Sequence, residues 1–331
     1  MEQRKDKSFV DIASSGLKKI VRDQRLVLLV LIVLLAIVIG AINPRFLTLN
    51  NIINILQSIS VLGLITLGMA ILMLSGGLDL SVGNIMVLSG CTIAVMIDNN
   101  PDNPSIVPIA VCVGLTIGFV AGAINGIIIS KSRCMPLIIS LGMSGIYFGL
   151  ALLITGGSYL SFKRAFEPLR AFRLGDVVPL NTMIFILMVV VIVLIIRYSK
   201  YGRRIVAIGG NEQNARLCGI NVDRYKIITY AFSGLLCSIA SILFASRLDS
   251  IVAQSGAGYE LDALTACIIG GITFDGGRGS IFGAFLGVIF MGLISNGMNV
   301  LGIESSVQYV VSGVIIVTAV IISNVNNLKR K

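Results

Sequence analysis

The chain contains no histidine and no tryptophan, and only 13% of its 331 residues carry a charge. The absence of histidine excludes metal sites built on imidazole and acid–base catalysis by a histidine side chain. The sequence also lacks the G-x-x-x-x-G-K-S/T loop that binds nucleotide phosphates, the G-x-S-x-G nucleophile turn and the H-E-x-x-H zinc motif. We therefore expect no enzyme: no catalytic residue, no metal ligand and no bound cofactor. If ATP drives this protein, another chain binds the ATP and its Mg²⁺.

Hydrophobic residues make up 56% of the chain, and the mean hydropathy is +0.95. These values are typical of a protein that crosses the membrane several times. The net charge of +10 does not indicate a nucleic-acid partner, because the basic residues lie in loops beside apolar runs. The six cysteines form no C-x-x-C pair and lie mostly in apolar runs, so they predict neither a disulfide framework nor a metal site.

Apolar runs divide most of the chain into segments of membrane-spanning length, for which a helix needs roughly 17–25 residues. We predict an all-α integral membrane protein, a polytopic bundle of about ten transmembrane segments within a domain that covers 26–323. The segment 262–272 is too short to cross fully. The predicted segments are 26–42, 51–74, 82–97, 106–130, 136–154, 180–197, 227–246, 262–272, 281–301 and 307–323.

The distribution of Lys and Arg predicts how these segments are oriented. Most of the 26 basic residues fall on one side of the membrane when the N-terminus is placed inside. By the positive-inside rule, the N-terminal tail (1–25), the loop 198–226 and the C-terminal tail (324–331) are cytoplasmic. The loop 155–179 lies outside and contains four basic residues and three phenylalanines. It is either a landing surface for an external partner or a segment that rests on the lipid headgroups.

Glycine recurs at every fourth position in two apolar runs, at Gly114, Gly118, Gly122 and Gly126, and at Gly279, Gly283 and Gly287. Small residues at this spacing let helices approach closely in lipid. The two runs therefore predict packing faces in a compact bundle, and they carry no information about a substrate.

Two glycine-rich segments, 75–84 and 270–280, interrupt the apolar runs. Corresponding glycines in the two segments are 194 or 196 residues apart, so the spacing predicts two related halves. Interrupted segments at matching positions point to the pathway of a transporter, because freed backbone is tolerated only beside protein or a cavity.

Asp79, in the first of these segments, is the most suggestive ionisable residue near a membrane segment. It either serves the pathway or caps the helix that begins near Leu80, where its carboxylate would accept from backbone N–H groups. Asp262 also precedes an apolar run and is open to the same two interpretations.

The stretch 201–222 is the longest polar segment after the N-terminal tail, and its pattern predicts one short capped helix from Glu212 to Cys218. Asn211 is placed as the N-cap, and Gly219 suits the left-handed residue that follows a helix. Glu212 in the first turn and Arg216 near the end complement the helix dipole. A helix this short is not stable alone, so it either rests on its own protein or is presented to a partner.

Three stretches resemble motifs of a known family: 77–83 (GLDLSVG), 202–222 and 259–280. Through them the chain, from Arg45 onward, resembles the membrane-spanning permease subunits of bacterial ABC sugar importers of the ribose, xylose, allose and galactoside type. The resemblance implies the bacterial cytoplasmic membrane, a separate ABC ATPase, a second permease copy or a paralogue, and an extracytoplasmic sugar-binding protein.

The resemblance also implies a role for the predicted short helix, as the coupling helix that sits in a cleft of the ATPase. The residues placed in this contact are Asn211, Glu212, Gln213, Asn214, Ala215, Arg216 and Gly219. Many ABC permeases have E-A-A-x-x-x-G here, and this chain lacks the glutamate and the first alanine. The departure leaves open which side chains touch the ATPase.

The function implied is inward passage of a monosaccharide, a ribose-like pentose or a hexose. Polar side chains within or beside the apolar runs suit hydroxyl groups, although hydrogen bonding between helices explains such residues equally well. The residues placed along the pathway are Gln57, Asp79, Ser81, Asn84, Asn125, Asn296 and Asn299.

Three alternatives stay open at this point. A permease of the same class could carry a nucleoside, an autoinducer sugar or an amino acid. An ion-coupled secondary transporter would need a relay of buried carboxylates, for which only Asp79 and Asp262 are candidates. A membrane enzyme is disfavoured by the lack of histidine and of clustered carboxylates.

Overall fold

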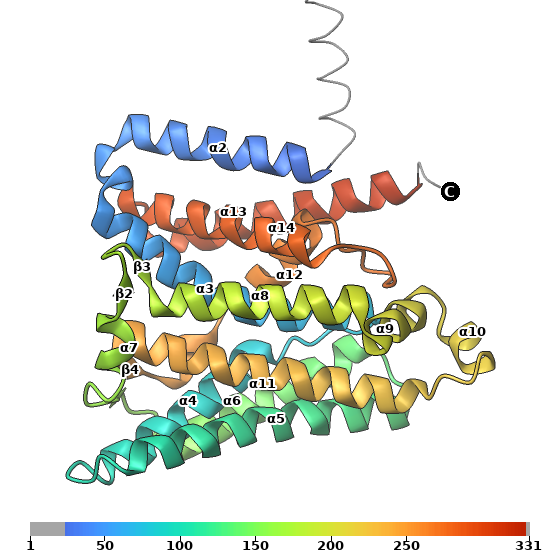
Figure 1. The fold of residues 1–331 in the computed structure, drawn as a ribbon, viewed down its shortest axis with the longest axis horizontal. Coiled ribbons are helices and arrows are strands. Elements are labelled where there is room, and N and C mark those ends of the chain that lie inside the picture. The colour runs from blue at the N-terminus through green and yellow to red at the C-terminus, as the bar shows by residue number, and fades with distance from the viewer. Residues whose placement is uncertain (1–23, 329–331) are drawn as a thin grey trace, which may run out of the picture.

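The computed structural model describes residues 24–328, a bundle of long helices that run side by side (Figure 1). The predicted N-terminal tail lies almost entirely outside the described residues, as do the last three residues of the C-terminal tail. The long helices are α2 (Gln24–Ile42), α3 (Leu49–Leu74), α4 (Val82–Asp98), α5 (Ile106–Ser132), α6 (Pro136–Thr155), α8 (Leu180–Tyr198), α11 (Val222–Leu248), α12 (Tyr259–Ile269), α13 (Ile281–Val300) and α14 (Ser305–Leu328).

Shorter elements gather at the two ends of the bundle (Figure 1). One end, here the α10 end, carries α9 (Lys200–Gly210) and α10 (Glu212–Leu217). The opposite end, here the strand end, carries two antiparallel pairs, in which β1 pairs with β4 and β2 with β3. The remaining short elements are η1 (Pro44–Leu47), β1 (Leu160–Ser161), α7 (Glu167–Ala171), β2 (Arg173–Leu174), β3 (Val178–Pro179), β4 (Ser250–Ile251) and η2 (Ala253–Gly256).

Seven of the described helices, namely α2, α3, α5, α6, α8, α11 and α13, are long and apolar enough to cross a membrane. The helix α4 and the apolar part of α14, 306–321, are shorter. The prediction is therefore confirmed in a coarser form, as a mostly helical protein with several candidate membrane spans, and the two short strand pairs were not predicted. Predicted helix ends differ from the observed ones where polar residues continue a helix beyond its apolar run. The segment predicted at 227–246 extends to 222–248, because Asn221 caps the start by accepting from the backbone N–H of Arg224.

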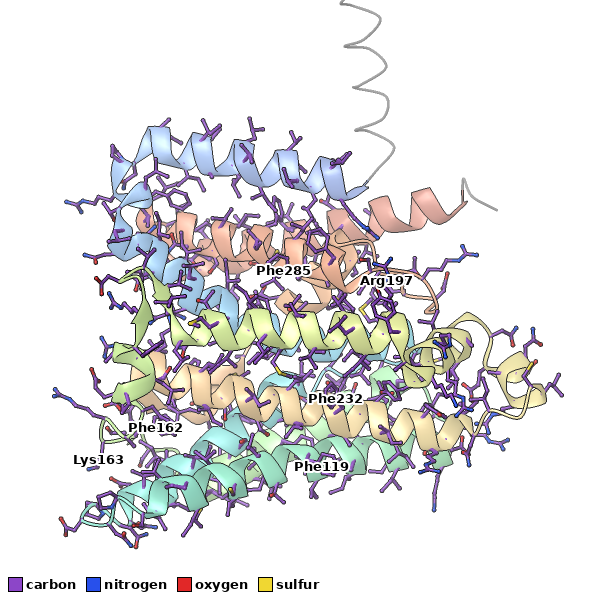
Figure 2. All side chains as sticks on the ribbon, viewed as in Figure 1. Phe119, Phe162, Lys163, Arg197, Phe232 and Phe285 are labelled. Carbon is purple, nitrogen blue, oxygen red and sulfur yellow. The ribbon has the colours of Figure 1, made fainter. Side chains whose placement is uncertain are left out.

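The helix α3 forms the centre of the bundle. Within its most apolar window 89% of the residues are buried, against 17% in α2 and in α6. The outward faces of α2 and α6 expose leucine and isoleucine, and side chains stand out from α2 on the face away from the bundle (Figure 2). Such faces suit contact with lipid tails.

The first glycine run packs α5 onto α11, as the spacing predicts. A Cβ atom added at Gly118 would lie 2.5 Å from the carbonyl oxygen of Gly234, and one added at Gly122 would lie 2.2 Å from that of Tyr230. The second run packs α13 onto α12, since a Cβ at Gly283 would lie 2.0 Å from the carbonyl oxygen of Gly270. Both predicted packing faces are therefore confirmed, except that Gly114 packs against Ile93 of α4 and Gly279 lies in the loop before α13.

We expect Gly122→Ala to destabilise the protein by about 1–3 kcal/mol, the usual effect of adding a methyl group to a tightly packed contact. Gly149→Ala is the matched control, because a Cβ at this helical glycine in α6 meets nothing within 4 Å. Alanine has the better helix propensity, so this control should keep or slightly raise stability. Thermal unfolding of both purified variants in detergent measures the difference, and equal shifts in the two would contradict the packing account.

Candidate functional site

The two interrupted segments meet at the α10 end of the bundle. The backbone N–H of Gly277 donates to the carbonyl oxygen of Leu74, the last residue of α3, at 3.0 Å. A Cβ at Gly276 would lie 2.8 Å from the Cα of Gly76 and 2.9 Å from the carbonyl oxygen of Gly209 in α9. Only residues without side chains fit this junction, which also supplies a donor to one of the free carbonyls at the end of α3.

A buried hydrogen-bond network supports the first interruption. Asp79 Oδ1 accepts from the backbone N–H of Ser81 at 2.8 Å and from its hydroxyl at 2.5 Å. Asn125 Nδ2, from α5, donates to Asp79 Oδ2 at 3.1 Å and to Ser81 Oγ at 2.8 Å. Tyr147 of α6 donates to Asn125 Oδ1 at 2.9 Å. Asp79, Ser81 and Asn125 are fully buried, so the network ties the start of α4 to α5 and α6.

Tyr230 of α11 completes this support and was not identified from the sequence. Its hydroxyl donates to the carbonyl oxygen of Leu78 at 2.9 Å and accepts from the backbone N–H of the same residue at 3.2 Å. Both backbone polar groups of Leu78 in the interruption are thus satisfied by a side chain. A lone tyrosine in an apolar run is the only sequence signal of this role.

The other residues predicted along the pathway are spread over several helix contacts. Asn84 Nδ2 donates to Ser144 Oγ at 2.7 Å, and Asn296 exchanges amide hydrogen bonds with Asn51 at 2.9 and 3.0 Å. Asn299 Oδ1 accepts from Gln308 Nε2 at 2.9 Å. Gln57 is buried in α3, and its side chain makes no hydrogen bond to another residue within 24–328. These contacts show hydrogen bonding between helices, and the pathway role of the seven residues stays a prediction.

A cavity of about 460 Å³ lies around the start of α12. Helices α3, α12, α13 and α14 form its walls, and none of the seven predicted pathway residues lines it. The sequence singled out Asp262 without assigning it a role, and it missed the other polar residues here because they come from four separate helices. The polar side chains that line the cavity are those of Ser58, Tyr259, Glu260, Asp262, Ser295, Gln308, Tyr309 and Ser312.

The short helix of the polar stretch forms as predicted, except that it ends at Leu217, with Cys218 as its C-cap. Asn211 Oδ1 accepts from the backbone N–H of Asn214 at 2.8 Å, which confirms the N-cap. Gly219 has a φ of +79°, which confirms the left-handed turn after the helix. In Figure 1, α10 projects beyond the ends of the long helices.

Ion pairs fix α10 to the start of α11. Arg216 pairs with Glu212 at 3.0 Å and with Asp223 at 2.5 Å, and Lys226 pairs with Glu212 at 2.6 Å. The hydrogen bond from Arg216 lowers the pKa of Asp223. Burial raises the pKa of Glu212, but the hydrogen bonds from Lys226 and Arg216 outweigh it, so this pKa is also lowered. The pairs are therefore fully formed above the ordinary carboxyl pKa and are lost only as the pH falls through the lowered values.

These contacts leave a defined outer face on α10. Ala215 packs inward with Ile208 and Val222, and Arg216 is engaged by two carboxylates. Gln213 and Asn214 are exposed, and Leu217 is 86% exposed. The coupling role of the seven residues predicted around this helix stays a prediction.

Comparison with known proteins identifies the kind of chain that carries these features. The model of a family described as "branched-chain amino acid transport system / permease component" matches residues 51–320. This chain belongs to that permease family. The match covers both interrupted segments, the cavity walls formed by α3, α12, α13 and α14, and α10.

Curated relatives of this permease cover nearly its whole length. It is 36% identical to the ribose import permease protein of Escherichia coli, over 90% of this chain and 92% of that protein. It is 39% identical to the ribose import permease protein of Bacillus subtilis, over 87% of this chain and 89% of that protein. Identity to the galactose/methyl galactoside import permease protein of Escherichia coli is 33%, over 91% and 94%. No solved structure gives a significant match.

We expect Asp79→Ala to destabilise the permease, because Ser81 and Asn125 each lose a buried acceptor, and every buried donor left unpaired costs about 1–3 kcal/mol. Asp79→Asn should cost less, since an amide oxygen can still accept from Ser81. Thermal unfolding in detergent tests both variants. If Asp79→Ala were as stable as the native protein and had lost only transport, Asp79 would not be needed to hold the start of α4, and a role in the pathway would be favoured.

Proposed function

We propose that this chain is the membrane-spanning permease subunit of an ATP-driven importer that carries a monosaccharide, a ribose-like pentose or a hexose. The observation that supports this most strongly is the nearly full-length similarity to import permeases named for ribose and galactose. A relative named as an L-arabinose transport system permease, 35% identical over 89% of this chain, adds a second pentose.

The other substrates considered from the sequence are less well supported. The family description mentions branched-chain amino acids, but the relatives above are all named for sugars. An ion-coupled transporter would need titratable carboxylates on the path. Of the two candidates, Asp79 is enclosed by three hydrogen bonds and has no contact with the cavity, whereas Asp262 lines it. The similarity to import permeases named for sugars, rather than the carboxylates, disfavours this alternative. A transport subunit of this family is not expected to be an enzyme itself.

The proposal assigns ATP and Mg²⁺ to an ABC ATPase on another chain and a sugar to a soluble extracytoplasmic binding protein. A second copy of the permease or a paralogue completes the membrane part. The α10 end then faces the cytoplasm of the bacterium and the strand end faces outward, with both termini inside. The basic residues of the loop 198–226 support this orientation.

The proposal also retains about ten membrane segments in two related halves. The halves are supported by a repeated arrangement of helices about the two interruptions. One helix ends at Leu74 and the next begins at Val82, while in the second half one ends at Ile269 and the next begins at Ile281. The shorter members of the set are α4, the 11-residue α12 and the apolar part of α14, 306–321.

We further propose that α10 docks into the ATPase through its exposed face, with Leu217 at the centre. A large apolar side chain that is exposed in the free chain contributes favourable free energy when a partner's cleft removes it from water. Arg216 and Glu212 hold the helix in place through their ion pairs, so substituting them would disturb the helix as well as the contact.

Gentle purification of the tagged chain from its native membranes tests this contact. An ATPase with a phosphate-binding loop should accompany the native chain and Leu217→Met. Leu217→Lys should retain about a tenth or less, because a buried lysine in a docking cleft removes the anchor and adds an unpaired charge. Size-exclusion chromatography in detergent shows whether each variant is folded.

Two results would contradict the assignment. If folded Leu217→Lys captured as much ATPase as the native chain, α10 would be a loop helix that does not contact the ATPase through Leu217. Absence of any ATPase from a native chain that is folded and transports would favour the ion-coupled alternative.

A further inference from the structure

The cavity at the start of α12 lies where α12 and α4 begin, and its lining includes the exposed residues Leu261, Ser295 and Tyr309. The strand β4 lies at the strand end, and the chain descends from it through η2 to the start of α12. On the way, Gly256 packs on Gly83 near the start of α4, since a Cβ at Gly256 would lie 2.4 Å from the carbonyl oxygen of Gly83.

Helix lengths give the depth of this point. The helix α12 begins three residues after Gly256 and runs toward the α10 end. Its 11 residues rise by about 16 Å, which is roughly half the thickness of the hydrocarbon core. The 17 residues of α4 run the other way to Asp98, which pairs at 3.0 Å with Lys163 at the strand end (Figure 2). The cavity therefore lies near mid-membrane depth, at the meeting point of two helix N-termini.

Two carboxylates line the cavity at this depth. Glu260 lies beside the N-terminus of α4, where a Cβ at Gly83 would be 2.8 Å from Glu260 Oε2. Its other oxygen accepts weakly from the backbone N–H of Gly258, at 3.4 Å. The carboxylate of Asp262 makes no hydrogen bond and no ion pair with any residue that the structure describes, although the residue is half-buried. A carboxylate at this depth without a partner is costly, and such residues mark substrate pathways.

The other residues that line the cavity indicate which kind of solute would suit it. Hydroxyl and amide groups face the cavity from α3, α13 and α14 at Ser58, Ser295, Gln308, Tyr309 and Ser312. No group of three metal-ligating side chains occurs in the described part of the chain. A neutral solute with many hydroxyl groups would donate to the carboxylates and exchange hydrogen bonds with the hydroxyl and amide groups.

We propose that this cavity is the transit site for the sugar, in which Asp262 is the main acceptor of hydrogen bonds from sugar hydroxyls and Glu260 is the second. The proposal rests on the proposed function and adds the residues that select a hydroxyl-rich solute. The volume of about 460 Å³ lies within the range of small-molecule sites. The single unpaired acceptor favours passage, because tight binding at many points would slow release.

The test uses the permease reconstituted in liposomes with its ATPase and a binding protein saturated with radiolabelled D-ribose. Asp262→Leu should lower ribose uptake about tenfold or more, while the stimulation of ATP hydrolysis by the loaded binding protein stays within about twofold of the native level. Asp262→Asn keeps one acceptor oxygen, so its ribose uptake should lie between that of the native chain and that of Asp262→Leu. Asp102→Leu, which removes an exposed carboxylate between α4 and α5, is the matched control and should transport like the native chain.

A second variant tests the cavity without changing a carboxylate. Ser312→Phe fills the space from α14 and should lower uptake far more than Ser312→Ala, which removes only one hydroxyl group. Because the same binding protein is used throughout, any difference between variants comes from the permease.

The outcomes separate this proposal from the proposed function. Native uptake without any effect of Asp262→Leu or Ser312→Phe would overturn the site and leave the function intact. Parallel loss of uptake and of stimulated ATP hydrolysis in Asp262→Asn would show that Asp262 supports the structure rather than the sugar. No ATP-dependent uptake of D-ribose, D-galactose or L-arabinose by the native complex would overturn the proposed function, and the site assignment with it.

Discussion

The structure depends on one constraint: a backbone interrupted within hydrocarbon must find all its hydrogen-bond partners in the protein. The chain meets this constraint at 75–81 and 270–280 by bringing the two interruptions together. Gly277 donates to the end of α3, Tyr230 holds Leu78 by both backbone groups, and Asp79 orders the turn before α4. The positions at which α3 and α12 end therefore determine where α4 and α12 lie, and with them the polar cavity beside α12.

The same junction connects the interior to the proposed docking helix. The end of α9 packs on it, with Gly209 against Leu74 and Gly276, and Asn211 alone separates α9 from α10. The ion pairs of Arg216 and Lys226 bind α10 to α11, the helix that carries Tyr230. Two rigid elements therefore join the exposed Leu217 to the interrupted segments. If α10 were displaced and α9 and α11 moved with it as rigid units, the interrupted backbone before α4 and after α12 would also move.

Local chemistry could be predicted from the sequence where the partners are close in the chain. The cap at Asn211, the turn at Gly219 and the glycine packing faces depend on residues within a few positions or on a repeat along one helix. Partners that lie far apart could not be predicted. An asparagine in an apolar run satisfies its amide equally well against a solute or another helix, so the Asn51–Asn296 pair, 245 residues apart, left no mark in the pattern. The cavity was missed for the same reason, since its polar lining is divided among α3, α12, α13 and α14.

ATP-driven sugar flux in proteoliposomes tests the central claim most directly. The permease, its ATPase and its binding protein are reconstituted with ATP on the side of α10, and labelled sugar is offered on the strand side. The account predicts uptake that requires hydrolysable ATP and continues when a protonophore and a sodium ionophore collapse the ion gradients. Uptake that follows an ion gradient and is indifferent to ATP would contradict it.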